Sequence, residues 1–279
     1  MTYIQADGRK PRLKAPPGAT DTHMHIYEPG YAMAPTALIK PLPDGTLDDY
    51  RQLQARLGLQ RVVVVQPSTY GLDNRCTMDA VAKAGAAARA VICADPSFSD
   101  DEIKKLRDRG ARGLRFFVMA GGPVGWDVFD EMAARAKTLA MHLQVQFDGR
   151  QFPERLGRLL PHASSVVIDH VGRFQEPVPV DSAPFQALLR LVDAGAWVKL
   201  SAPYESTTSR PPWRDIGGLA KVLLAHAPDR MMWATNWPHP NQDPRPDDAD
   251  LLDMLLDWTA DEALCTRVLV DNPARLYGF

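Results

Sequence analysis

Eight short runs of β-branched and apolar residues alternate with longer segments of helical spacing, and this alternation limits the possible folds more than any other feature. The runs are residues 20–26, 61–66, 90–94, 113–117, 142–146, 165–170, 197–201 and 231–236. They begin about 20 to 40 residues apart, which is the length of a strand and its crossover helix. Strands joined by such crossovers pair in parallel.

The segments between the runs carry signals for helices. Thr46 precedes two aspartates, and Ser99 with Glu102 three residues later forms a capping-box pattern that ends before Gly110. We expect helices that begin near residue 47 and cover residues 80–90, 99–110, 127–140, 182–194, 213–227 and 248–259.

Eight strand–helix units with nearly continuous apolar strands predict an α/β fold that closes into a (β/α)8 TIM barrel. We expect a single barrel domain over residues 19–279, preceded by an N-terminal arm of residues 1–18 that is rich in Lys, Pro and Gly. A doubly wound sheet is the alternative, but no GxGxxG pattern follows the first run.

The composition excludes several classes of function. The 32 Lys and Arg residues nearly balance the 34 Asp and Glu residues, so the net charge of -2 offers no basic surface for nucleic acid. No apolar run approaches the length of about 18 residues that a membrane span needs. The start of the chain lacks the apolar segment of a signal peptide, and the three cysteines lack metal or disulfide spacing. We expect a cytoplasmic enzyme with a small-molecule partner, no contact with nucleic acid or membrane, and homo-oligomer formation left open.

Reactive side chains of such barrels lie at the carboxyl ends of the strands. His23 and His25 are two residues apart in the first run, so both point to the same side of a strand. His170 ends the sixth run. These three histidines predict a cluster that either exchanges protons and hydrogen bonds or binds a divalent metal.

Arg115 lies within the apolar run 113–117, where a buried guanidinium requires an anionic partner in the substrate or in the barrel. Other polar side chains follow or end the runs: Ser68, Arg75, Gln146, Tyr204 and Asn236. We expect this group to bind substrate.

Four short motifs resemble the amidohydrolase superfamily. They are residues 21–25 (DTHMH), 169–173 (DHVGR), 235–239 (TNWPH) and 272–277 (NPARLY). The resemblance covers about residues 18–279, and within the superfamily it is strongest to the branch of 2-pyrone-4,6-dicarboxylate lactonases and D-galactarolactone isomerases, with the isomerases the closer match. It implies a distorted (β/α)8 barrel that acts on a small lactone with a carboxylate.

The chain departs from the pattern of most superfamily members at three positions. Asn236 stands where they have an aspartate that activates water, and an amide cannot take a proton at neutral pH. Arg115 and Gln146 stand where metal-dependent members supply a carboxylated lysine or a histidine. We therefore expect no cofactor, with one zinc ion held by His23, His25 and His170 as the alternative.

The expected reaction is isomerisation of a sugar-acid lactone by intramolecular acyl transfer. We expect His170 or His25 to be the acid–base group and His23 and Asn236 to donate hydrogen bonds. The expected carboxylate-binding residues are Arg115 and Arg75, and the expected hydroxyl-binding residues are Gln146, Ser68 and Tyr204. Three alternatives stay open: hydrolysis of a pyrone- or muconolactone-type dicarboxylate bound by Arg75, Arg115 and Arg173, zinc-dependent hydrolysis or decarboxylation, and binding of a sugar acid without reaction.

Overall fold

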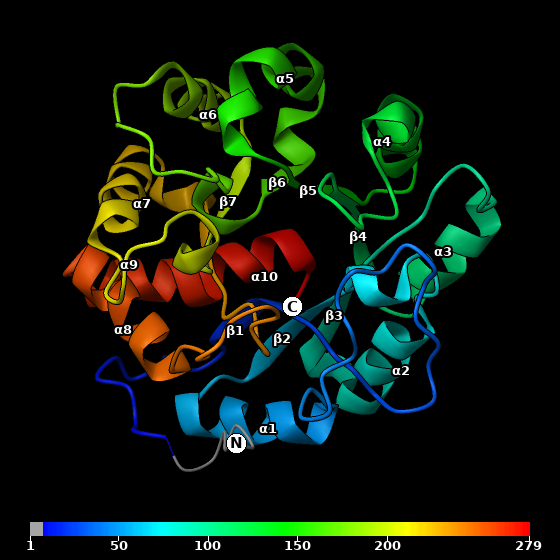
Figure 1. Cartoon of the computed structure of the whole chain (residues 1–279), viewed down its shortest axis with the longest axis horizontal. Coiled ribbons are helices and arrows are strands. Elements are labelled where there is room, and N and C mark those ends of the chain that lie inside the picture. The colour runs from blue at the N-terminus through cyan, green and yellow to red at the C-terminus, as the bar shows by residue number, and fades with distance from the viewer. Residues whose placement is uncertain (1–7) are drawn as a thin grey trace.

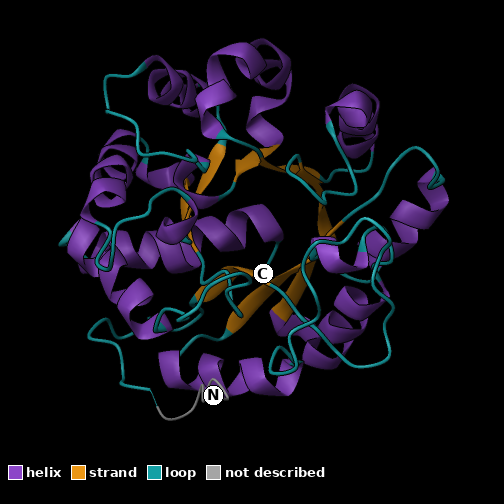
Figure 2. Cartoon of the chain, in the orientation of Figure 1, coloured by secondary structure: helices purple, strands orange, loops and turns teal. Residues whose placement is uncertain are grey.

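Eight parallel strands follow one another around the sheet of this computed structural model, which describes residues 8–279. The strands are β1 (Thr20–Met24), β2 (Arg61–Val65), β3 (Ala88–Ile92), β4 (Ala111–Phe117), β5 (His142–Gln146), β6 (Val166–Ile168), β7 (Trp197–Leu200) and β8 (Met231–Trp233). Helices surround the ring of strands (Figures 1 and 2). The predicted (β/α)8 barrel is confirmed.

Each strand is followed by helix. The helices are α1 (Leu47–Leu57), α2 (Arg75–Ala84), α3 (Asp100–Asp108), α4 (Phe129–Thr138), α5 (Phe152–Leu159), α6 (Ala183–Asp193), α7 (Arg214–His226), α8 (Asp248–Thr259), α9 (Glu262–Thr266) and α10 (Asn272–Tyr277). The prediction of a helix over residues 80–90 is wrong at the carboxyl end of that segment. Helix α2 stops before Gly85, which has a φ of 74°, and β3 begins at Ala88. Helix α5 was not expected at all.

Helix α1 shows how local sequence sets an element. The Thr46 side chain accepts a hydrogen bond from the backbone of Asp49, whose carboxylate accepts one from the backbone of Thr46. This capping box satisfies amide groups that the first helical turn leaves free. The helix ends at Gly58, which has a φ of 75° and therefore a conformation that favours glycine. The buried side chains Leu47, Tyr50, Leu53 and Leu57 face the barrel.

The barrel closes between β1 and the segment that follows β8. The backbone N–H of Asn236 donates to the carbonyl of His23 at 2.8 Å, and that of His25 donates to the carbonyl of Trp237 at 2.8 Å. Met24 and Trp237 form an isolated parallel bridge in the same place. These contacts hold Asn236 beside the two histidines of the first strand.

Helix α10 covers the end of the barrel where the strands begin. Tyr277 is fully buried and belongs to an apolar cluster inside the barrel that includes Val65, Val167 and Trp197. The guanidinium groups of Arg89 and Arg112, at the starts of β3 and β4, both donate to the Tyr277 carbonyl at 3.2 Å. In Figures 1 and 2 this helix crosses the ring of strands. This helix leaves the opposite end of the barrel, at the carboxyl ends of the strands, open for a functional site.

The described part of the expected N-terminal arm, residues 8–18, lies against α8. The backbone N–H groups of Arg12 and Leu13 donate to Asp253, and the Arg12 guanidinium donates to Asp257 at 2.8 Å. The remainder of the arm lies outside the described residues, and the division into arm and domain stays a prediction. Among residues 8–279, no helix is both long enough and apolar enough to cross a membrane.

Candidate active site

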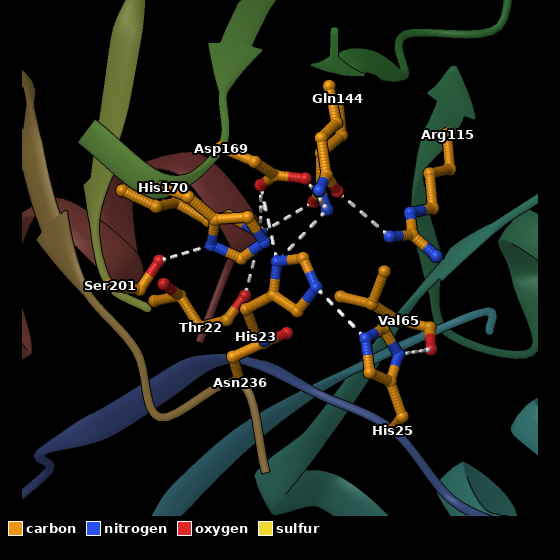
Figure 3. Close-up of polar contacts among 12 residues, drawn as sticks. Thr22, His23, His25, Val65, Arg115, Gln144, Asp169, His170, Ser201 and Asn236 are labelled. Carbon is orange, nitrogen blue, oxygen red and sulfur yellow. Dashed lines mark hydrogen bonds and ion pairs between the residues drawn. The ribbon is translucent and has the colours of Figure 1, made fainter. Parts of the chain in front are cut away.

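A cavity lies at the carboxyl ends of the strands, and six of the predicted site residues line it. They are His25, Ser68, Arg115, Gln146, His170 and Asn236. Each comes from a different strand or from the segment directly after that strand, namely β1, β2, β4, β5, β6 and β8. Closure of the barrel therefore brings together side chains that are far apart in the sequence (Figure 3).

Hydrogen-bond contacts join the two histidines of the first strand to Asp169 (Figure 3). His25 Nδ1 donates to the Val65 carbonyl at 2.8 Å, and its Nε2 lies 3.3 Å from Nε2 of His23. His23 Nδ1 lies 3.2 Å from Oδ1 of Asp169. Each neutral imidazole carries one N–H, and these two hydrogens serve the Val65 carbonyl and Asp169. The Nε2 atoms of His23 and His25 then face each other with their lone pairs, which leaves room between them for a proton or another cation.

Three buried residues with no expected role, Gln144, Asp169 and Lys199, support this cluster. Gln144 donates to Asp169 Oδ2 at 3.0 Å, and Lys199 Nζ donates to Gln144 Oε1 at 2.6 Å. Lys199 Nζ also lies 3.6 Å from Oδ1 of Asp169. All three side chains are fully buried, and burial lowers the pKa of Lys199 to about 8. The sequence contains a signal for this support: Lys199 lies within the apolar run 197–201, and a charged residue on a buried strand requires partners.

His170 has a different environment from the other two histidines. Its Nδ1 lies 2.8 Å from Ser201 Oγ, whereas its Nε2 has no hydrogen-bond partner among the described residues. Its ring centre lies 4.9 Å from that of His23. His170 Nε2 is therefore available to a ligand in the cavity.

Burial keeps all three imidazoles neutral. It lowers the pKa of His25 to about 3 and the pKa values of His23 and His170 well below 6.5. Positive charge adds to this effect, because Lys199 lowers the pKa of His23 and Arg115 lowers that of His25. Neutral rings keep a lone pair, so each can accept a proton or a hydrogen bond.

Arg115 supplies a buried cation without a carboxylate partner among the described residues. Its guanidinium donates to the Gln66 carbonyl at 2.6 Å and to Gln146 Oε1 at 3.1 Å, and lies 4.8 Å from the ring centre of Phe117. Its Nε is buried and has no partner in the described part of the chain. A buried guanidinium held by neutral groups is a favourable binding site for an anion.

Asn236 is held by a series of buried polar side chains. Its Nδ2 donates to Tyr204 Oη at 3.1 Å, Tyr204 Oη lies 2.8 Å from His239 Nδ1, and His239 Nε2 lies 3.0 Å from Asp248 Oδ1. When His239 donates from Nε2 to Asp248, its Nδ1 accepts a hydrogen bond from the Tyr204 hydroxyl. Tyr204 oxygen then accepts from Asn236, which leaves Asn236 Oδ1 and one amide hydrogen for a ligand. His239 and Asp248 had no expected role.

The backbone is strained where these residues leave the strands. His170 and Val171 have φ angles of 53° and 55°, and Asn236 and His239 have 64° and 59°. Left-handed backbone is strained for β-branched Val171, whereas asparagine and histidine adopt it more readily. Such strain is concentrated at functional sites. It also explains why the expected strands 165–170 and 231–236 end early, at Ile168 and Trp233.

The structure does not bring every predicted residue to the cavity. Arg75 is a correction: its side chain is 74% exposed, forms an ion pair with Asp73 at 2.6 Å and lies outside the cavity wall. Helix α2 begins at Arg75, and the aspartate two residues earlier holds the guanidinium in solvent. His23 lies behind the cavity wall rather than in it, and Tyr204 reaches the wall through Asn236.

The described residues include a cluster that can hold a metal ion. Ligand atoms of His23, Asp169 and His170 all lie within 4.8 Å of one another, whereas the expected set had His25 in place of Asp169. The facing Nε2 atoms of His23 and His25 also suit a cation, since their outer nitrogens contact Asp169 and a carbonyl. The fit is limited by Lys199 and Arg115, whose fixed positive charges act on the same imidazoles.

A closed parallel barrel with histidines, an arginine and an amide at the carboxyl ends of its strands has the arrangement of a barrel enzyme's active site. Comparison with known proteins makes this specific. The family model described as "Amidohydrolase" matches residues 20–279, and the chain belongs to this family of enzymes.

The chain is similar to proteins named as acting on lactones. It is 38% identical over 277 residues to a D-galactarolactone isomerase of Agrobacterium fabrum, covering 97% of this chain and 94% of that protein. It is 35% identical over 287 residues to a 2-pyrone-4,6-dicarboxylate hydrolase of Comamonas testosteroni, covering 98% and 94%. A ligand-free crystal structure from Agrobacterium tumefaciens superposes with a TM-score of 0.92, at 36% identity and 98% coverage of both chains.

Proposed function

We propose that this enzyme isomerises a sugar-acid lactone with a free carboxylate by intramolecular acyl transfer. The observation that carries the proposal is the presence of both Asn236 and His170 on the wall of one cavity. Asn236 cannot accept a proton from water, whereas His170 is neutral and has an available Nε2. This arrangement suits an attacking group that the substrate itself supplies. The name of the isomerase relative supports the same substrate class.

The chemistry needs one proton acceptor that later becomes a donor. A substrate hydroxyl attacks the lactone carbonyl carbon while His170 Nε2 takes its proton. The new carbon–oxygen bond forms, the tetrahedral intermediate carries a negative oxygen, and the original ring carbon–oxygen bond breaks. His170 returns the proton to the oxygen that leaves. No atoms are gained or lost, so water is not consumed.

The other cavity residues position the substrate. Arg115 binds the carboxylate with its unpaired charge, and Gln146 holds the guanidinium in place. Asn236 presents an amide hydrogen to the developing oxyanion, and its Oδ1 accepts a hydrogen bond from another hydroxyl of the substrate. Ser68 lies on the wall as a hydroxyl-binding group. We assign His23 to the support of His25 rather than to contact with substrate.

Incubation of the enzyme with a panel of aldaric and muconic lactones in oxygen-18 water, followed by NMR, tests the proposal. We expect a rearranged lactone without label. Labelled open-chain acid as the main product identifies hydrolysis instead and contradicts the proposal. Absence of any reaction across the panel also contradicts it.

A metal-dependent lactone hydrolase is the second candidate function, and the 3.3 Å separation of the Nε2 atoms of His23 and His25 favours it. A divalent ion held by His23, His25 and His170 would polarise a carbonyl and lower the pKa of a bound water. We propose that no metal is needed, because Lys199 and Arg115 already place positive charge beside these rings. Metal analysis of protein purified without chelator should find substoichiometric metal, and chelation should leave the activity unchanged. Stoichiometric zinc that is required for turnover would make the metal-dependent hydrolase the favoured function.

A further inference from the structure

One ion pair on the cavity wall takes no part in the proposed reaction. The guanidinium of Arg173 donates to the carboxylate of Glu205 at 2.6 Å, and both residues line the cavity. Their side chains are only 13% and 18% exposed, so bulk water screens the pair weakly. The carboxylate of Glu205 therefore neutralises the second arginine of the wall.

A count of the charges around the cavity leaves one positive charge without a counterion in the described structure. Lys199 is buried outside the cavity wall, and Asp169, whose Oδ1 lies 3.6 Å from Lys199 Nζ, balances its charge. Arg173 is matched by Glu205. Arg115 remains, with a backbone carbonyl, an amide oxygen and an aromatic ring as its neighbours.

We infer that the cavity selects lactones with a single carboxylate and that Glu205 is the residue that excludes a second one. The inference rests on the proposed function in that the ligand is a lactone, but it concerns binding and not the reaction. An aldaric acid closed into a monolactone keeps one free carboxylate. A pyrone dicarboxylate has two.

The exclusion follows from where the second carboxylate would have to lie. Arg173 is the other guanidinium on the cavity wall, and its Nε is buried without a partner among the described residues. A second carboxylate that approaches this guanidinium meets the carboxylate of Glu205 on the same group. Like charges brought together in a poorly solvated site are strongly unfavourable. Removal of the Glu205 charge would free Arg173 and turn the same place into a second anion site.

Two probes that differ by one carboxylate test this inference: 2-pyrone-6-carboxylate and 2-pyrone-4,6-dicarboxylate. Their binding to the full chain is measured by calorimetry, with product analysis in parallel so that turnover is recognised. We expect the wild-type protein to bind the monocarboxylate about tenfold or more tightly than the dicarboxylate. In Glu205→Gln, which keeps the shape and removes the charge, dicarboxylate binding should strengthen about tenfold, with monocarboxylate binding nearly unchanged.

Two further variants locate the effect. Glu176→Gln removes an acidic side chain that is 78% exposed, outside the cavity wall, and should leave the ratio of the two affinities unchanged. Glu205→Gln combined with Arg173→Met should lose the gain in dicarboxylate binding. Equal affinities in the wild-type protein, an unchanged ratio in Glu205→Gln or no binding of either probe would overturn the inference. The wild-type comparison stands even if Glu205→Gln does not fold. Selective binding without isomerisation would contradict the proposed function and leave the inference intact.

Discussion

His170, His25 and His23 share the same side-chain chemistry, and their hydrogen bonds give them different tasks. Both ring nitrogens of His23 and of His25 have partners, among them Asp169 and the Val65 carbonyl. His170 has a partner only at Nδ1, where Ser201 fixes the ring. A group that must take and return a proton needs a free nitrogen, so the acid–base task falls to His170.

Substitution His170→Gln should lower kcat by about 10²- to 10⁴-fold, the usual contribution of a positioned acid–base group. Binding of an unreactive carboxylated lactone should stay nearly the same, because Arg115 is untouched. Single-turnover kinetics and calorimetry measure the two quantities. His226→Gln, at a histidine paired with Asp193 away from the cavity, is the matched control. A kcat within about twofold of the wild type would remove His170 from the mechanism.

Substitution Asn236→Asp should increase hydrolysis relative to isomerisation, because a carboxylate next to the lactone can accept a proton from water. Oxygen-18 incorporation into the product measures this partition. Tyr204→Phe is the matched control, since it removes the hydroxyl that orients the amide without adding a base. We expect it to slow the reaction with no increase in label. An unchanged partition in Asn236→Asp would contradict the role given to the amide.

The two ends of the barrel differ, because a helix closes one end and the other end holds the cavity. Helix α10 covers the end where the strands begin and packs Tyr277 inside it. His142, the first residue of β5, lies against Tyr277 with ring centres 5.2 Å apart. Its Nε2 is buried without a partner among the described residues, and burial lowers its pKa to about 3.

This buried histidine makes the packing of α10 sensitive to acid. The folded protein binds the His142 proton less readily than the unfolded chain, whose pKa is about 6.5. Stability is therefore fully present above pH 6.5 and is lost as pH falls toward 3. His142→Leu should reduce the loss in free energy of unfolding between pH 7 and pH 5 by about 2 kcal/mol. Urea unfolding at the two pH values measures it.

A second histidine variant separates this effect from a general change in charge. His226→Leu removes a histidine that is 33% exposed and paired with Asp193, and it serves as the control. If His142→Leu and the wild-type protein lose the same free energy between the two pH values, His142 is not the group that titrates.

At the scale of the whole molecule, the fold could be predicted because it repeats. Eight apolar runs at the spacing of strand–helix units define a barrel even where single elements are missed. Helix α5 was missed, and the start of β3 at Ala88 was taken for helix, because alanine-rich sequence favours helix locally. The packing of the barrel overrides that preference. The near-neutral net charge of -2 likewise conceals a cavity with one unmatched arginine.

The site could be predicted in part for a related reason. Residues at strand ends meet in any closed parallel barrel, which is why six of the predicted residues line the cavity. The partners of these residues depend on pairings across the barrel, such as His23 with Asp169, 146 positions apart, and Lys199 with the Thr22 carbonyl, 177 positions apart. No local pattern specifies such pairings. Arg75 failed for the opposite reason, because a neighbour two residues away holds it in solvent.

The closure of the barrel between β1 and the segment after β8 links enzymatic activity to the completeness of the ring of strands. Asn236 reaches the cavity because its backbone and that of Trp237 complete the pairing with His23 and His25 of the first strand. The earliest and the latest parts of the ring thus become competent in a single event. If the eighth unit separates from the first, the other cavity residues stay on their strands and only Asn236 loses its place beside them. We therefore expect turnover to be lost when the barrel opens between β1 and the segment after β8.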